Sequence, residues 1–232
     1  MTLMNAGLLK RIGLASAMVV GLSGAALAAD PVEEKAGHDW DIAFGVTATS
    51  DYISRGFTQT DGGAAIQPWA ELTVGMFYAG YWGSNVAGGW EHDLSVGIRP
   101  ELGPVSLDLG YVRYIYSTGD CCGEVYAKAS ISPAEPLTLG AAVFHDPDAK
   151  NTYFEGNASF ALVENISASG ALGLTNWGDG SPDTTSWNAG LSWTPAEWVK
   201  FDGRYYGGPT ADKVVFSVSL MSSVKTFMAP GN

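Results

Sequence analysis

The sequence predicts an all-β protein that closes into an antiparallel, up-and-down transmembrane β-barrel of about twelve strands. Three observations lead to this fold class. Apolar and polar residues alternate along most of the chain, short and long connections alternate between the resulting segments, and few charges interrupt the apolar faces. Charged residues make up only 16% of the chain, against roughly 25% in ordinary soluble domains.

The N-terminal residues have the pattern of a secretory signal peptide. A basic pair, Lys10-Arg11, precedes an apolar stretch over 12–24, and Ala26-Leu27-Ala28 forms an A-x-A cleavage pattern. The apolar stretch is too short to cross a bilayer as a helix. We therefore expect a signal peptide over 1–28 and an outer-membrane β-barrel domain over 29–232, with an uncleaved N-terminal anchor as the alternative.

The charge balance narrows the class of partner. Loss of the basic pair would change the formal net charge from −12 to −14, since the removed segment holds no acidic residue. Such a charge argues against nucleic acid, because phosphate binding needs lysine and arginine. It is compatible with the passage of cations, although a solvated acidic surface would give the same value. No later run of roughly 18 apolar residues suggests a helical span.

Period-2 alternation defines each expected strand. It is clearest over 90–99, where apolar Leu94, Val96 and Ile98 alternate with polar or small residues. In order, the expected strands are 39–50, 64–73, 76–85, 90–99, 104–116, 124–132, 137–145, 151–161, 165–175, 184–193, 198–206 and 213–221. The second is the weakest because Pro68 interrupts it, and proline is tolerated in sheets only at edges or bulges.

The connections between these strands alternate in length. Short turns fall at 74–75, 100–103, 133–136, 162–164 and 194–197. Longer polar loops fall at 51–63, 117–123, 146–150, 176–183 and 207–212, and the loop at 86–89 is an exception in being short. Tight periplasmic turns and longer outer loops are typical of an up-and-down membrane barrel. An even strand count returns both ends of the barrel to the periplasmic side.

The two faces of the strands favour a membrane barrel over a soluble sandwich. The polar face carries mostly Gly, Ser, Thr, Asn and Tyr, which suits a hydrated interior. Each of the best-defined strands has one face free of basic residues, and an Arg or Lys on the lipid side would cost roughly 2–4 kcal/mol at mid-membrane. Tryptophans near the expected strand ends suggest interfacial girdles: Trp40, Trp193 and Trp198 on the periplasmic side, and Trp82, Trp90 and Trp177 on the outer side. Trp69, expected on the inner face, does not fit this pattern.

Two sequence motifs then carry a family resemblance. The first runs from Ser50-Asp51-Tyr52 through Arg55-Gly56 and Thr58-Gln59-Thr60 to Ala65-Ile66-Gln67, and the second is 77–86, FYAGYWGSNV. With these motifs the chain resembles the TorF family of porins, also called the Gcw_chp family of proteobacterial outer-membrane proteins. Weaker matches lie at 108–111 and 114–116, so the resemblance covers essentially the mature chain. It implies an outer-membrane, porin-like barrel and supplies no substrate.

The C-terminal end departs from that pattern. Outer-membrane barrels usually finish on an aromatic residue that marks the last strand for assembly. The last clear strand here stops near Leu220, and the chain continues to Asn232. Phe227 could end a longer strand, and it is the remaining candidate for the terminal aromatic residue.

The expected inner face supplies the candidate pore-lining and mouth residues. Asp51 and Arg55 lie at the mouth of the first hairpin. Arg55 either folds inward, pairs with lumen acids and narrows the pore, or it staples the loop, with Gly56 permitting a turn. The pore-lining candidates are Glu71, Glu91, Asp93, Arg99, Asp108, Glu124, Lys128 and Glu155, and Asp41, Lys200, Asp202 and Arg204 share the same face. Acids outnumber bases, and charged rings set ion selectivity. The alternative is a salt-bridged plug, because such a barrel is narrow.

Other chemistry finds little support in the sequence. His92 is expected on the lipid face near the outer rim, with Ser84 across the hairpin, but a serine–histidine pair needs a mutual hydrogen bond and an orienting third group. Two outer loops hold clustered acids without calcium-loop spacing. These acids are Asp146 and Asp148, next to His145, in one loop and Asp179 and Asp183 in the other. The adjacent Cys121 and Cys122 suit a loop detail, oxidised after export, better than a zinc site or redox centre.

Together these observations predict a monomeric, porin-like outer-membrane channel for passive diffusion of small polar solutes or cations. No catalytic, cofactor-binding or metal-binding residue is predicted, and membrane lipid surrounds the barrel. The main alternative is a non-conducting barrel with a structural or adhesive role. A barrel enzyme acting on lipid is the less favoured third hypothesis.

Overall fold

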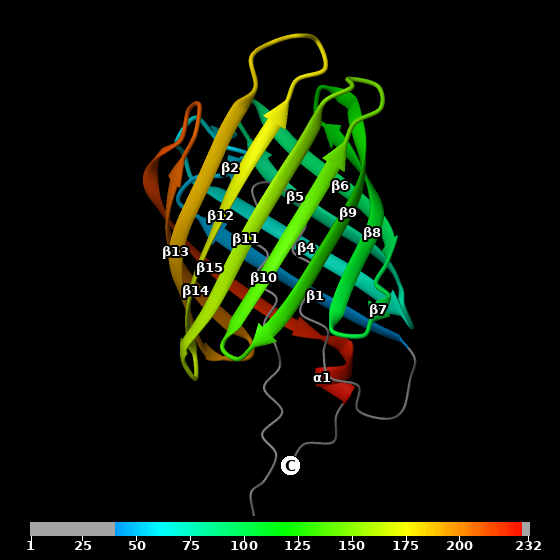
Figure 1. Ribbon diagram of the computed structural model, residues 1–232, viewed down its shortest axis with the longest axis vertical. Coiled ribbons are helices and arrows are strands. Elements are labelled where there is room, and N and C mark those ends of the chain that lie inside the picture. The colour runs from blue at the N-terminus through cyan, green and yellow to red at the C-terminus, as the bar shows by residue number, and fades with distance from the viewer. Residues whose placement is uncertain (1–39, 229–232) are drawn as a thin grey trace, which may run out of the picture.

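The computed structural model describes residues 40–228, and the expected signal peptide over 1–28 lies outside the described residues. Strands dominate the chain (Figure 1). In order they are β1 (Trp40–Thr49), β2 (Ile53–Ser54), β3 (Phe57–Thr58), β4 (Ala65–Val74), β5 (Phe77–Val86), β6 (Gly89–Ile98), β7 (Glu101–Leu102), β8 (Val105–Tyr116), β9 (Gly119–Ala134), β10 (Leu137–His145), β11 (Thr152–Val163), β12 (Ile166–Asn176), β13 (Thr184–Ala196), β14 (Val199–Gly207) and β15 (Asp212–Ser223), followed by α1 (Val224–Met228). Across residues 40–228, no helix has the length and apolar character of a membrane span.

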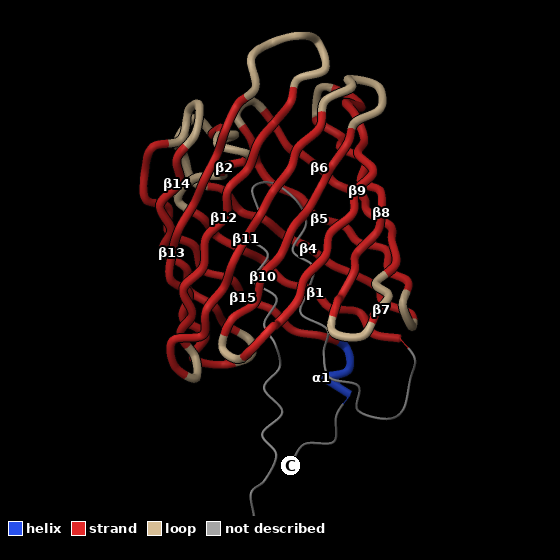
Figure 2. The backbone as a smooth tube through the Cα atoms, in the orientation of Figure 1, coloured by secondary structure: helices blue, strands red, loops and turns tan. Residues whose placement is uncertain are grey.

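Twelve long strands close into an antiparallel barrel, as the sequence predicts. Each pairs with its neighbours in chain order, β1 also pairs with β15, and a β6–β8 pairing completes the ring. Strand β7 is a short addition beside β8, while β2 and β3 form a separate two-stranded sheet. Longer loops gather at one end of the barrel and tight turns at the other (Figure 2). The predicted alternation of connections is therefore confirmed, except between β8 and β9, where the expected long loop is a short turn.

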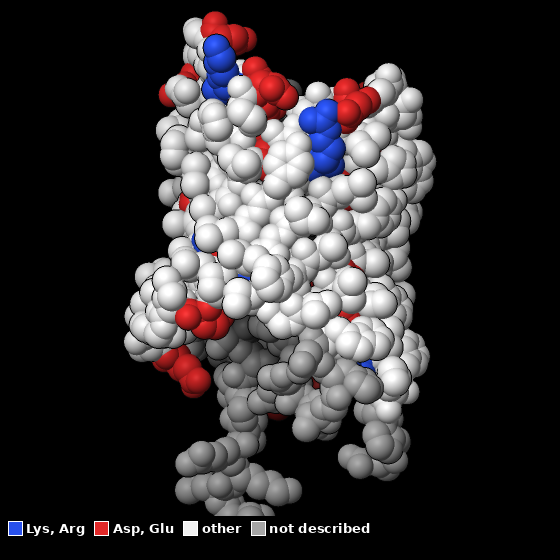
Figure 3. Space-filling view, turned by 90° about the vertical axis from the view of Figure 1, so that its right-hand side faces the viewer, with Lys and Arg blue, Asp and Glu red and all other residues white. Residues whose placement is uncertain are grey.

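The apolar side chains of the strands face outward. On β6, Leu94 and Val96 are exposed, whereas Glu91, Asp93 and Ser95 are buried. On the face of the barrel seen in Figure 3, few charged side chains lie between the two ends, and most gather toward the rims. An exposed apolar wall around a polar interior is the reverse of a soluble protein and matches the hydrocarbon core of a membrane.

The tryptophan prediction holds only in part. Trp40, Trp90, Trp193 and Trp198 are exposed on the outer wall. Trp82, expected in the outer girdle, is instead 5% exposed and pairs in register with Asp93 on the inner face. Its place along β5 was predicted correctly, but its face was not, because aromatic residues occupy both faces of that strand.

One further expectation needs correction, and two weaker ones gain a structural explanation. The 117–123 segment is not a loop, because β9 begins at Gly119 and pairs with β8 as far as Tyr116. This pairing skips Cys121, which forms a disulfide with Cys122. Pro68 lies inside β4, where pairing with β5 has already ended and only the β1 ladder continues. That position is compatible with proline because the strand has a free edge there.

The end of the described chain is helical, so the expectation that Phe227 ends a longer strand is wrong. Strand β15 stops at Ser223, and the Ser223 hydroxyl accepts the Thr226 amide at 3.3 Å as an N-cap. The Asp41 carboxylate accepts the Lys225 amide at 3.1 Å. Phe227 then stacks on exposed Phe44, with ring centroids 6.2 Å apart, on the outside of the barrel.

Close packing inside the wall gives a first testable prediction. A Cβ on Gly97 would lie 2.6 Å from the Tyr78 ring and 2.6 Å from the Leu109 carbonyl oxygen. Gly97→Ala is therefore expected to lower the free energy of unfolding by about 1–3 kcal/mol, as in other overpacked interiors. Gly156→Ala is the control, because a Cβ on Gly156 meets nothing within 4 Å. Denaturant unfolding of the refolded variants measures the difference, and equal midpoints would contradict the packing argument.

Candidate functional site

The first loop folds into a hairpin that packs against the far part of the barrel. Strands β2 and β3 turn at Arg55 and Gly56, whose φ angles are 49° and 82°. Gly56 also lies against Gly208 and Pro209, leaving no room for a Cβ, so glycine is required both for the turn and for this contact. Its carbonyl oxygen accepts the Thr210 and Ala211 amides, each at 3.0 Å. A cavity of about 10 Å³, lined in part by Gly56, remains beside the turn.

The Arg55 side chain extends from this hairpin across the interior of the barrel. Its Nη1 and Nη2 donate to the two carboxylate oxygens of Glu124 on β9, at 2.7 and 2.6 Å. Its guanidinium lies 4.5 Å from the Tyr153 ring centroid on β11 and 5.3 Å from that of Phe144 on β10. In the ring of strands, β10 is the farthest from β1 in both directions. The arginine therefore joins a loop that starts at β1 to the opposite wall, and pairs with a predicted inner-face acid.

Asp51 fixes the base of the same loop. Its Oδ1 accepts the Thr58 and Thr60 hydroxyls at 2.7 Å each, and its Oδ2 accepts Lys213 Nζ of β15 at 2.8 Å. Burial alone would raise the pKa of the Asp51 carboxyl, but Lys213 and the two threonines outweigh it and hold that pKa below its ordinary value. Asp51 thus stays ionised and ties the loop to the rim.

A second charged group covers the wall from β4 to β9. Arg99 donates to both Glu71 oxygens at 2.6 and 2.8 Å, and its Nε lies 3.7 Å from Asp108. Lys128 lies 3.6 Å from the same Asp108 carboxylate, which also accepts the Tyr78 hydroxyl at 2.6 Å. Four of the predicted inner-face residues are therefore brought together, and their charges largely balance.

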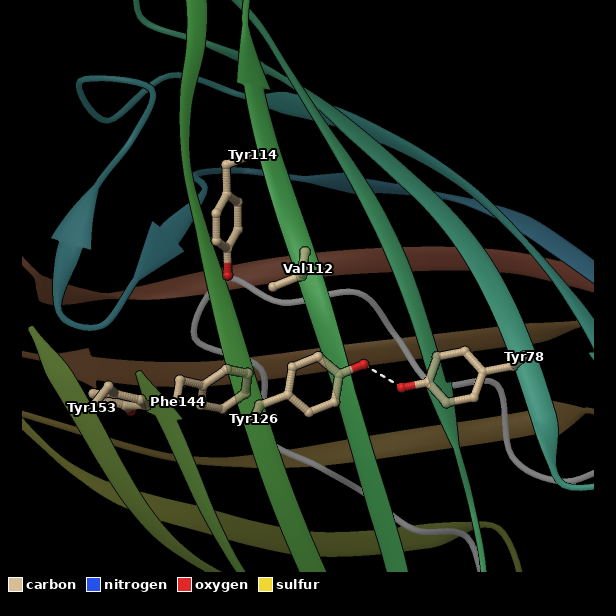
Figure 4. Close-up of a cluster of buried hydrophobic side chains, with 6 residues drawn as sticks. All are labelled: Tyr78, Val112, Tyr114, Tyr126, Phe144 and Tyr153. Atoms are coloured by element: carbon tan, nitrogen blue, oxygen red, sulfur yellow. Dashed lines mark hydrogen bonds between the residues drawn. The ribbon is translucent and has the colours of Figure 1, made fainter. Parts of the chain in front are cut away.

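A row of aromatic rings connects the two charged groups. Tyr78, Tyr126, Phe144 and Tyr153 follow one another along the inner wall, and the Tyr78 and Tyr126 hydroxyls are hydrogen-bonded (Figure 4). The Tyr126 and Phe144 centroids are 5.3 Å apart, and those of Phe144 and Tyr153 are 6.2 Å apart. Since the row starts at the ring under Arg99 and ends at the ring under Arg55, it supports both arginines by cation–π contact.

The other predicted residues also face inward. Glu91 accepts the Tyr116 hydroxyl at 2.6 Å, Asp93 is 1% exposed, and Glu155 accepts the Tyr153 hydroxyl at 3.0 Å. On the other side of the barrel, Arg204 contacts Asp202 at 3.0 Å, Asn188 at 2.7 Å and Ser169 at 2.8 Å. Lys200 lies on the same face of β14 as Asp202, whereas Asp41 lies by α1, away from these groups.

The sequence-based prediction missed several contributors to the site. Lys213, Phe144 and the tyrosines Tyr52, Tyr114 and Tyr116 all make contacts to the predicted residues. The signal for the tyrosines was visible: Tyr114 and Tyr116 are separated by two, as residues on one strand face must be. No signal was available for Lys213, because its pairing with Asp51 depends on the barrel closing β1 against β15.

The structure does not bring together the residues of the alternative catalytic and metal sites. Ser84 pairs in register with Glu91 and is buried inside, whereas His92 is on the outer face, where it bonds the Tyr81 hydroxyl at 2.9 Å and stacks on Trp90. The serine and histidine thus lie on opposite sides of the wall. Within residues 40–228, no three His, Cys, Asp or Glu side chains are grouped to hold a metal ion.

Comparisons with solved structures agree with this fold. A structure titled "KdgM porin" superposes with a TM-score of 0.62 at 9% identity, covering 78% of this chain and 98% of that one. A second, titled "KdgM porin in complex with disordered oligogalacturonate", gives a TM-score of 0.60 at 9% identity over the same shares. The structure "NanC porin structure in rhombohedral crystal form" gives 0.54 at 11% identity, covering 79% and 98%. The barrel therefore has the same fold as these porins.

Sequence comparison gives the family. No curated protein matches this sequence. The family model described as "Bacterial protein of unknown function (Gcw_chp)" matches residues 33–229, which is most of the chain. The two motifs at 50–67 and 77–86 lie inside the matched region. The chain therefore belongs to the Gcw_chp family of bacterial proteins.

Proposed function

We propose that this protein is a porin-like channel of the bacterial outer membrane that passes small polar solutes or cations by diffusion. The observation that supports the proposal is the distribution of side chains, which is the reverse of that in a soluble protein. Its outer wall is apolar, while Glu71, Glu91, Asp93, Glu124 and Glu155 are buried inside it. Charged side chains that face inward from an apolar wall are the arrangement of a membrane barrel with a polar interior.

In this proposal the first-loop hairpin sets the width and charge of the path. Arg55 crosses to Glu124 and places a cation in the interior, while the surrounding acids keep the lining negative. Rings of fixed charge of this kind set ion selectivity in pores. Solutes would pass without a chemical step or cofactor. The protein works as a monomer in this proposal, and its two sequence motifs support the narrower TorF assignment.

A second candidate is a non-conducting barrel with a structural or adhesive role. It is favoured by one observation: the Arg55–Glu124 pair and the Glu71–Arg99–Asp108–Lys128 group place side chains from several walls inside a narrow barrel. Such a network could act as a plug, in which case solute contacts would be confined to the outer loops.

Planar-bilayer recording of the refolded full chain separates the two candidates. A channel is expected to give discrete conductance steps and, in a salt gradient, a reversal potential that favours cations. The same protein left unfolded in denaturant is the control for leakage by detergent or aggregates. Steps that favour anions would contradict the proposed lining. Silence from correctly folded protein would leave the structural barrel as the better description.

A further inference from the structure

Three carboxylate oxygens inside the barrel have no hydrogen-bond partner among the described residues. They are Oε2 of Glu91 and both side-chain oxygens of Asp93. Both residues lie on the inner face of β6 and are nearly inaccessible, with 3% and 1% of their surface exposed. A buried carboxylate without a partner is strongly unfavourable. The Asp93 carboxylate therefore lacks a positively charged or donor group that the described residues do not supply, whereas Glu91 has the Tyr116 and Tyr52 hydroxyls beside it.

The basic residues that face the same side of the interior are paired with other acids. Arg55 uses both of its terminal nitrogens on Glu124, Arg99 uses its terminal nitrogens on Glu71, and Lys128 faces Asp108. Glu124 is close enough to Asp93 to add to the negative potential there. Arg55 neutralises Glu124, so the group formed by Glu91, Asp93, Glu124 and Arg55 keeps two negative charges when all are ionised.

The surroundings of these oxygens are aromatic. Tyr116 donates its hydroxyl to the other Glu91 oxygen at 2.6 Å, and Trp82 is paired in register with Asp93. Tyr52 meets Trp82 edge to face, with centroids 5.3 Å apart, and both rings are buried. Carboxylates beside aromatic rings form an environment that suits an organic cation, because the rings attract its positive charge and cover its apolar part.

We propose that Glu91 and Asp93 bind the primary ammonium group of a small solute inside the barrel. A primary ammonium has three N–H donors and no acceptor, so one such group can donate to both unpartnered Asp93 oxygens and also to Glu91. A divalent metal fits less well, because no third His, Cys, Asp or Glu joins a metal-binding group within residues 40–228. The proposal rests on the proposed channel in one respect: the solute must be able to reach the interior.

Equilibrium binding tests this site without requiring conduction. Folded protein in detergent is titrated with methylammonium chloride in a calorimeter at constant ionic strength. We expect saturable binding that is at least about tenfold weaker for tetramethylammonium, which has the charge but no N–H donors. Asp93→Asn and Glu91→Gln are each expected to weaken methylammonium binding about tenfold or more, as for loss of a hydrogen bond to a charged group. Asp179→Asn removes an exposed loop acid and should change nothing.

Several outcomes would overturn the ammonium site. These are equal binding of the two probes, equal competition by sodium, or unchanged methylammonium affinity in both variants. The last would be expected if protons, not a solute, neutralised Asp93 and Glu91. The comparison of probes needs no variant, so it remains decisive even where a substitution prevents folding. Binding without conductance would reject the channel and keep the site, whereas conductance without binding would do the opposite.

Discussion

Replacing Arg55 with alanine is expected to raise the unitary conductance of the reconstituted protein and to increase its preference for cations. Arg55 is the side chain that spans from the first loop to the opposite wall, where it holds Glu124 at 2.6 Å. Its removal deletes both an obstruction and a positive charge from the proposed path. The Glu124 carboxylate then faces that path unneutralised, which strengthens the negative lining.

The same substitution should destabilise the protein. The Arg55 and Glu124 side chains are only 17% and 5% exposed, and removing one partner of a buried ion pair typically costs about 3–5 kcal/mol. Addition of Glu124→Gln removes the stranded charge and should restore part of that loss. In the double variant the conductance should stay high, because the space left by the Arg55 side chain is still open. The selectivity should return toward the original value, because no unpaired carboxylate remains at position 124.

Arg113→Ala is the matched control for this experiment. Arg113 also forms a two-pronged ion pair, with Asp120, but it projects from the other face of β8, between inward-facing Val112 and Tyr114. Its removal should leave conductance and selectivity unchanged. If Arg55→Ala folds normally and conducts like the original protein, Arg55 is a loop staple and does not narrow the path.

The barrel could be predicted from the sequence because the direction of each side chain and the ends of each strand are set by neighbouring residues. The alternation over 90–99 reports which side chains face lipid, and the turn residues report where each strand ends. The least accurate boundary was at 117–123, where polar residues suggested a loop but cross-strand pairing extends β9 by several residues. That extension depends on the partner strand, so no local pattern contains it.

The site was predictable in its residues but not in its pairings. Alternation placed Glu71, Arg99 and Asp108 on the inner face. These residues lie on β4, just after β6 and on β8, so they are far apart in the sequence. Whether Arg99 meets Glu71 or another acid depends on strand stagger and side-chain reach, which appear only in the closed barrel. Trp82 shows the same limit, because a strand with aromatic residues on both faces gives no local sign of which face is inside.

Replacing Leu172 with arginine is expected to reduce folding into lipid sharply. Leu172 is 72% exposed and lies near the middle of β12, between partners Gly156 and Trp187 on neighbouring strands. If this surface meets hydrocarbon, an arginine at mid-membrane costs about 2–4 kcal/mol. Urea unfolding of the protein refolded into vesicles should show that loss as a lower midpoint.

Val163→Arg is the control that separates membrane depth from surface charge. Val163 is also exposed, but it lies at the end of β11 beside a tight turn. An arginine there reaches the interface, and the expected cost falls to about 0–1 kcal/mol. A soluble barrel would tolerate arginine equally at both exposed positions. Equal stability of the two variants would therefore refute the orientation on which the interior site depends, whereas a depth-dependent loss would place the apolar wall in lipid and leave the charged residues enclosed.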